Sequence, residues 1–188
     1  MKDAALWDQL RSGHHPALEQ IYRQHAEALF RYGCKFASDA NMVEDCMHDL
    51  FMDLWNNRER LGPNTGIRPY LLVSLRRRIF KKVQTQHQRF SSNEPVEADF
   101  KAELAVDEGI ISSETDQETA AKLQAAFQQL SARQREAVYL KFYQELEYQE
   151  ICDIMGVSYQ SARNLVSEAL RSLRGLLAFF AGICFLFF

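Results

Sequence analysis

The segment EICDIMGVSYQSARNLVSEAL, from Glu150 to Leu170, has helical periodicity on both sides of a single glycine. Ile151 and Met155 are four residues apart, the spacing of neighbours on one helix face. Gly156 allows the positive φ angle of a tight turn, and Ser158 is a favourable N-cap for a second helix. The segment therefore predicts two short helices joined by a turn at Gly156.

The second of these helices is apolar on one side and rich in hydrogen-bond donors on the other. At 100° per residue its apolar side consists of Ala162, Leu165, Val166, Ala169 and Leu173. This is the pattern of a helix-turn-helix, whose second helix packs on the first and enters the major groove of DNA. A helical hairpin with a solvated polar face explains the same pattern. The candidate DNA-binding residues are Tyr159, Gln160, Arg163, Asn164, Ser167 and Arg171.

A second surface of interest is basic and lies in the N-terminal half. Residues 61–93 contain no acidic side chain, although the chain has a net charge of −3, and a helix is expected from Pro69 into the mid-eighties. Such segregation of charge indicates a polyanionic partner, and an aromatic ring among cations favours single-stranded or melting DNA. A basic face that is merely solvated is the alternative. The candidate residues are Arg68, Tyr70, Arg77, Arg78, Lys81 and Lys82.

The segment VEDCMHDLFMDLW, Val43 to Trp55, predicts a helix with an apolar side and an adjacent acidic stripe bordered by large aromatics. This composition is typical of a protein-docking surface. The alternative is a helix that buries Trp55 in the core and turns its acids to solvent. The candidate docking residues are Asp45, His48, Asp49, Phe51 and Trp55.

The remaining sequence predicts an all-α fold. Apolar residues recur at intervals of three and four, and no segment alternates as a strand would. In residues 86–117 the periodicity fades and acidic residues accumulate, as in a linker. We expect two small helical domains, 1–85 and 118–177, joined by this acidic linker and followed by an apolar tail, 178–188. The C-terminal domain contains the helix-turn-helix, and a capping box at Ser131 begins one of its helices.

The chain offers no catalytic or ligand-binding motif. Its cysteines and histidines lack metal-ligand spacing, and it has no phosphate-binding loop or nucleophile–base pairing. We therefore expect no enzyme activity, metal, cofactor or small-molecule substrate. The N-terminus lacks the apolar run of a secretory signal, which predicts a cytoplasmic protein.

The apolar stretch at the C-terminus, residues 175–188, would be about 21 Å long as a helix, shorter than the roughly 30 Å hydrocarbon core of a bilayer. We expect it not to cross a membrane. It could pack on its own domain, dock on a regulatory partner or lie at a membrane surface.

The order of these parts resembles bacterial RNA polymerase sigma factors of the extracytoplasmic-function (ECF) type, in the sigma-70 family, from about Leu18 to Leu177. VEDCMHDLFMDLW is similar to the family's A-E-D-x-x-Q-E-x-F-x-x-x-W box, which docks on the polymerase clamp helices. The segment RPYLLVSLRRRIF looks like the part that opens the minus-ten promoter element, with Arg77 where the family often has Asn. Ser161-Ala-Arg-Asn164 stands where T-V-K-S or T-V-R-N is common in the domain that binds the minus-thirty-five element.

This resemblance assigns polymerase binding to the five docking residues, including His48 where Gln is usual. It implies an alternative sigma factor that binds core RNA polymerase and promoter DNA, and it allows an anti-sigma factor as partner, including a membrane-bound one. Two other classes stay open. A dimeric helix-turn-helix repressor or activator would bind symmetric half-sites without polymerase. The lack of a catalytic motif and the presence of two separate surfaces suited to DNA argue against a nucleic-acid enzyme or a helical scaffold.

Overall fold

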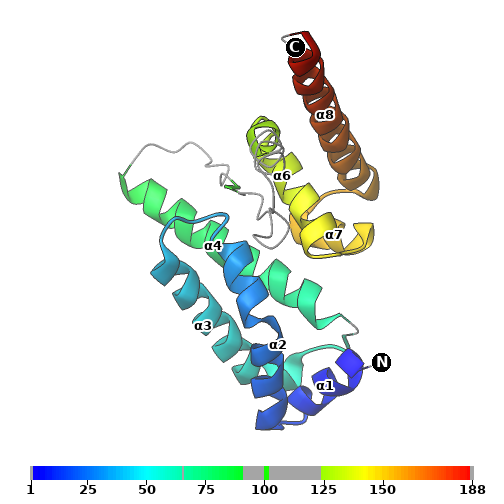
Figure 1. Cartoon of the computed structure of the whole chain (residues 1–188). Helices are drawn as coiled ribbons and strands as arrows, with labels where there is room; N and C mark the ends of the chain where they lie inside the picture. The colour runs from blue at the N-terminus through cyan, green and yellow to red at the C-terminus, as the bar shows by residue number, and fades with distance from the viewer. Residues whose placement is uncertain (1, 65, 91–99, 102–123, 187–188) are drawn as a thin grey trace. The chain divides into compact units, whose positions relative to one another are not determined.

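The computed structural model describes residues 2–64, 66–90, 100–101 and 124–186, with side chains described except at 2, 86–90 and 175–186. The chain forms two compact units, of which the second begins at Phe100 (Figure 1). Within the described ranges every regular element is a helix. The prediction of an all-α fold with two helical domains is confirmed.

The N-terminal unit is built from four α-helices and one short 3₁₀ helix. In Figure 1, α2, α3 and α4 lie side by side, and each contacts the other two. The first helix, α1, packs on α2, α4 and η1. The start of α3 is fixed by the carboxylate of Asp39, which accepts hydrogen bonds from the backbone N–H groups of Asn41 and Met42. The elements are α1 (Lys2–Arg11), α2 (His15–Gly33), α3 (Ala40–Asn56), η1 (Arg58–Arg60) and α4 (Ile67–Phe90).

At Gly33, the last residue of α2, side chains of both α3 and α4 come very close to the backbone of α2. A Cβ atom at this position would lie 2.5 Å from Cγ1 of Val43 in α3 and 3.1 Å from Cδ1 of Ile79 in α4. Both of these apolar residues are fully buried. Because protein interiors are close-packed, only a residue without a side chain fits between the two helices here.

The C-terminal unit contains α6 (Ala132–Val138), the π-helical turn η2 (Tyr139–Tyr143), α7 (Tyr148–Met155) and α8 (Tyr159–Leu186). The predicted capping box at the start of α6 is present, with Ser131 and Gln134 each bonded to the other's backbone N–H. The predicted turn is also present, since Gly156 ends α7 with a φ angle of 65°. Helix α8 packs on α6, and its Ala162, Val166 and Ala169 are buried as expected.

Other sequence predictions fall on residues that are not described. Most of the acidic linker, 86–117, and the start of the C-terminal domain, 118–123, lie outside the described residues, so the domain boundaries stay predictions. The backbone of α8 continues as a helix to Leu186, but the side chains of the tail, 178–188, are likewise outside. Among the helices that are described, none has the length and apolar character needed to span a membrane.

The contact at Gly33 predicts a loss of stability for Gly33→Ala. Overpacking a core costs about 1–3 kcal/mol, and the better helix propensity of Ala offsets up to about 1 kcal/mol of this. We expect a lower free energy of unfolding in urea, followed by circular dichroism. Gly62→Ala is the matched control, because a Cβ atom at Gly62 has no neighbour within 4 Å. Equal unfolding midpoints for the two variants would contradict the tight contact.

Candidate nucleic-acid and docking interfaces

The first turns of α8 present the donor-rich face that the sequence predicted. All six candidate residues from Tyr159 to Arg171 are exposed. Gln160 donates a hydrogen bond through Nε2 to Oδ1 of Asn164, at 2.9 Å. The hydroxyl of Ser158 accepts from the backbone N–H of Ser161 at 3.1 Å and caps the helix. The helix thus begins at a defined residue and holds a row of amide, hydroxyl and guanidinium groups toward solvent.

Tyr148 of α7, which contacts this face, was not identified from the sequence. The ring of Tyr159 meets that of Tyr148 in α7 edge to face, with centroids 5.9 Å apart. Nζ of Lys141 lies over the ring of Tyr148, 5.0 Å from its centroid. The π-helical turn exposes Phe142 and Tyr143, and burial raises the pKa of the Tyr143 phenol. The aromatic-rich segment YLKFY could have indicated these residues, but which of its side chains are exposed depends on the π-helical geometry.

Some cations on the basic side of α4 are paired with acids of α3, and others are not. Arg78 pairs with Asp53 of α3 at 2.6 Å, and Lys82 pairs with Asp45 of α3 at 3.3 Å. Arg77 and Lys81 are exposed, and no ion pair joins either of them to a described residue. The latter two are directly available to phosphate. Because exposed ion pairs contribute only about 0–1 kcal/mol, Arg78 and Lys82 can exchange their carboxylate for a phosphate at little cost.

Tyr70 lies in the first turn of α4 and leaves 38% of its surface exposed. Its ring meets the ring of Trp7 edge to face, with centroids 5.0 Å apart and planes at 67°. Tyr70 borders a cavity of about 270 Å³ between α3, the following loop and α4. Arg68, two residues before Tyr70 in the same turn, is half-buried. The other residues that line the cavity are Leu50, Asp53, Leu54, Asn57, Leu61, Ser74 and Arg78.

The five docking candidates on α3 differ in exposure. Asp45, His48 and Asp49 are exposed, whereas Phe51 is buried against the ring of Tyr22, with centroids 5.0 Å apart. Trp55 is half-buried between the ring of His15, at 5.4 Å, and the guanidinium of Arg58, at 4.4 Å. The acidic stripe therefore faces solvent, and the two aromatics contribute largely to packing.

A hollow of about 610 Å³ lies between α2 and α3, beside the acidic stripe. Tyr22 of α2 is 51% exposed at its edge, and the pattern of α3 by itself does not predict this contribution from a second helix. Burial raises the pKa of the Cys46 thiol in α3, so this side chain is an uncharged part of the core. The hollow is lined by Tyr22, Ala26, Glu27, Phe30, Glu44, Met47, His48 and Phe51. In the described part of the chain no group of His, Cys, Asp or Glu side chains could hold a metal ion.

Comparison with known proteins identifies both surfaces as parts of one family. Residues 21–89, which include α3 and the basic side of α4, match the model of sigma-70 region 2. Residues 120–173, which include α7 and the donor-rich face of α8, match the model of sigma-70 region 4. The two matched regions are separate and together cover most of the chain.

Similar proteins cover almost the whole length of the chain. It is 24% identical to RNA polymerase sigma factor CarQ of Myxococcus xanthus over 174 residues, covering 90% of this chain and 94% of the relative. It is 21% identical to ECF RNA polymerase sigma factor SigK of Mycobacterium ulcerans (strain Agy99) over 177 residues, covering 92% of each.

Two solved structures have the same fold. One is CnrH in complex with the cytosolic domain of CnrY, with a TM-score of 0.61, 19% identity and coverage of 94% of this chain and 97% of that chain. The other is the sigma factor RpoE in complex with the anti-sigma factor NepR from Bartonella quintana, with a TM-score of 0.58, 19% identity and coverage of 85% and 96%. With regions 2 and 4 both matched and ECF sigma factors among its relatives, the chain belongs to the sigma-70 family as a sigma factor of the extracytoplasmic-function type.

Proposed function

We propose that this protein is an alternative sigma factor that binds core RNA polymerase and directs transcription from specific promoters. The observation that carries the proposal is that each matched region holds its own exposed polar surface. In region 2 these are the acidic stripe of α3 and the cations of α4, and in region 4 it is the donor-rich face of α8. The two units thereby supply separate contacts to polymerase and to two promoter elements.

Polymerase docking is assigned to α3. Asp45, His48 and Asp49 are exposed, and His48 lines the hollow that Tyr22 borders, together with the acids Glu27 and Glu44. Exposed charges around an apolar hollow match the polar rim and apolar centre of a protein interface. Phe51 and Trp55 support this surface from below, because their rings hold α3 against α2 and against Arg58.

Strand opening is assigned to α4. Arg77 and Lys81 can bind the phosphates of a separated strand, and the exposed part of the Tyr70 ring can stack on an unpaired base. Upstream recognition is assigned to α8, where Arg163 and its neighbours can reach base edges in the major groove. The protein then has no catalytic role of its own and acts in the cytoplasm, where it meets polymerase and DNA.

We further infer that an anti-sigma factor regulates this protein. The support is the fold it shares with RpoE of Bartonella quintana, which was solved with the anti-sigma factor NepR. Such a partner would act by covering a surface that polymerase needs.

The proposed function predicts that promoter recognition requires polymerase. The isolated chain has a net charge of −3, and each of its two surfaces assigned to DNA is small. We therefore expect it to bind promoter DNA weakly when polymerase is absent. Core polymerase should hold both surfaces on one promoter and produce tight, specific binding. Binding is measured with and without core polymerase at one salt concentration, because phosphate contacts make affinity salt-dependent. Tight binding of the isolated chain to a symmetric site, without polymerase association, would favour a dimeric regulator.

Arg163→Ala should weaken promoter use and relax preference at one or two upstream positions, because a bidentate contact to a base contributes about 1–3 kcal/mol of discrimination. Transcription from a set of promoters with single upstream changes measures this. Arg133→Ala removes the same charge from an exposed position on α6 and should leave the preference intact. An equal loss of activity on all upstream sequences would show that Arg163 contacts phosphate only.

Tyr70→Ala should slow strand opening more than it weakens polymerase binding, because stacking on a base contributes about 1–3 kcal/mol. Opening is measured with a fluorescent base analogue in the start region. The defect should shrink on a template that is already mismatched there, and Tyr70→Phe, which keeps the ring, should behave much like the native chain. A similar loss on intact and mismatched templates would point to a packing role for Tyr70.

A further inference from the structure

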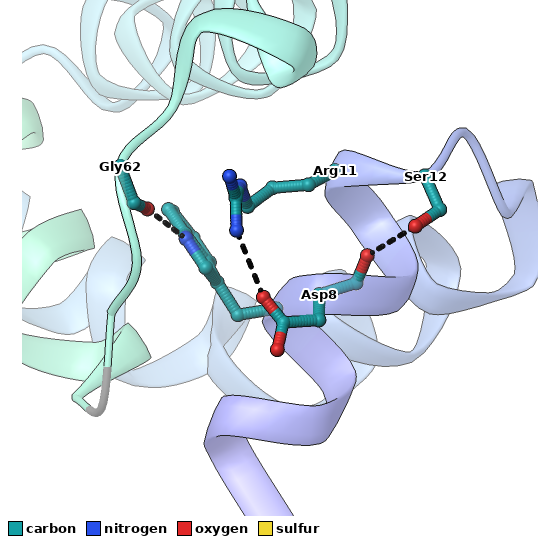
Figure 2. Close-up of polar contacts among 5 residues, drawn as sticks. Asp8, Arg11, Ser12 and Gly62 are labelled. Carbon is teal, nitrogen blue, oxygen red and sulfur yellow. Dashed lines mark hydrogen bonds and ion pairs between the residues drawn. The ribbon is translucent and has the colours of Figure 1, made fainter.

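Trp7 of α1 connects two segments that are distant in sequence. Its indole Nε1–H donates a hydrogen bond to the carbonyl oxygen of Gly62, 55 residues away, at 2.9 Å (Figure 2). Only 1% of Trp7 is exposed, and a buried indole N–H requires an acceptor. In this protein the acceptor belongs to the loop between η1 and α4, so the position of that loop is tied to α1.

The same indole ring also contacts Tyr70. The two rings meet edge to face at 5.0 Å, the preferred geometry of an aromatic pair. Leu61, the neighbour of Gly62, and Tyr70 both border the cavity of about 270 Å³ beside the basic side of α4. One buried side chain therefore holds two parts of this cavity's wall, and it comes from a helix that precedes the region matched by the family model.

We propose that Trp7 is a positioning residue for strand opening, because it fixes the ring of Tyr70 and the segment at Gly62 before DNA arrives. This inference rests on the proposed function. Tyr70 keeps 38% of its surface exposed while one part of its ring is held by Trp7. A ring that is already oriented loses less conformational freedom when a base stacks on it, and stacking is correspondingly more favourable.

The position of Trp7 separates this role from polymerase docking and from general stability. Trp7 is buried, and its hydrogen bond and its ring contact are made with Gly62 and Tyr70, not with the exposed acids Asp45 and Asp49 of the docking surface. Helix α1 is also anchored by Leu6 and Leu10, which are buried independently of the indole N–H group. Loss of the donor should therefore disturb the cavity wall and leave α1 in place.

The test compares Trp7→Phe, Tyr70→Ala and the double variant, each as the full chain with core polymerase. Phe keeps an apolar ring but cannot donate to Gly62. We expect Trp7→Phe to slow opening of an intact promoter by about 2- to 10-fold, the factor expected for one aromatic contact. Polymerase affinity should be unchanged, and the defect should shrink on a mismatched template. Because Trp7 acts through Tyr70, the double variant should open no more slowly than Tyr70→Ala alone.

Two controls separate positioning from folding. Leu10→Val removes one buried methylene group from α1 without touching Tyr70, and it should leave the opening rate unchanged. If Trp7→Phe does not fold, benzothienylalanine at position 7 keeps the shape of the indole and replaces its N–H with sulfur, and the same slowing is expected.

Three results would overturn the proposal: additive effects in the double variant, equal slowing on intact and mismatched templates, or slowing by Leu10→Val as large as that by Trp7→Phe. Each of these would leave the proposed function intact, since the native chain still opens the promoter. Failure of the native chain with core polymerase to open any promoter would instead overturn both this inference and the proposed function.

Discussion

The close contact at Gly33 is the constraint on which the N-terminal unit depends. Because Gly33 has no side chain, Val43 of α3 and Ile79 of α4 can both approach the end of α2. This approach fixes the separation between α3 and α4, and at that separation the carboxylates of α3 reach the cations of α4. Helices α3 and α4, to which we assign docking and DNA binding, therefore share one rigid arrangement, so a partner bound to one of them acts on a framework common to both.

The ion pairs between α3 and α4 also compensate part of the basic charge of α4. Lys82 and Arg78 are each held near an acid of α3, so only part of the basic charge of α4 is uncompensated in the free protein. The pairs are exposed and therefore weak, and a phosphate group can take the place of a carboxylate. This arrangement suits a protein with a net charge of −3 that has to bind DNA in complex with a larger partner.

In the C-terminal unit, a glycine turn and a helix cap set the positions of the helices. The left-handed conformation of Gly156 turns the chain between α7 and α8, and Ser158 then caps α8. Small residues on the inner side of α8, Ala162 and Ala169, are fully buried, which lets the helix lie close to its neighbours. The outer side is consequently free for polar side chains along its first turns.

Local patterns in the sequence were sufficient for the fold class, the turn at Gly156, the capping box at Ser131 and the polar face of α8. Helical periodicity, capping and positive φ angles each depend on residues a few positions apart, so a single sequence contains them. Only the tertiary structure showed that, of these four cations of α4, Arg78 and Lys82 are paired with α3, whereas Arg77 and Lys81 make no ion pair with a described residue. It also showed that Phe51 and Trp55 are mainly packed. The contact of Trp7 with Gly62 and Tyr70 likewise had no sequence signal, because it joins residues more than 50 positions apart, and no periodic pattern specifies which distant side chains meet.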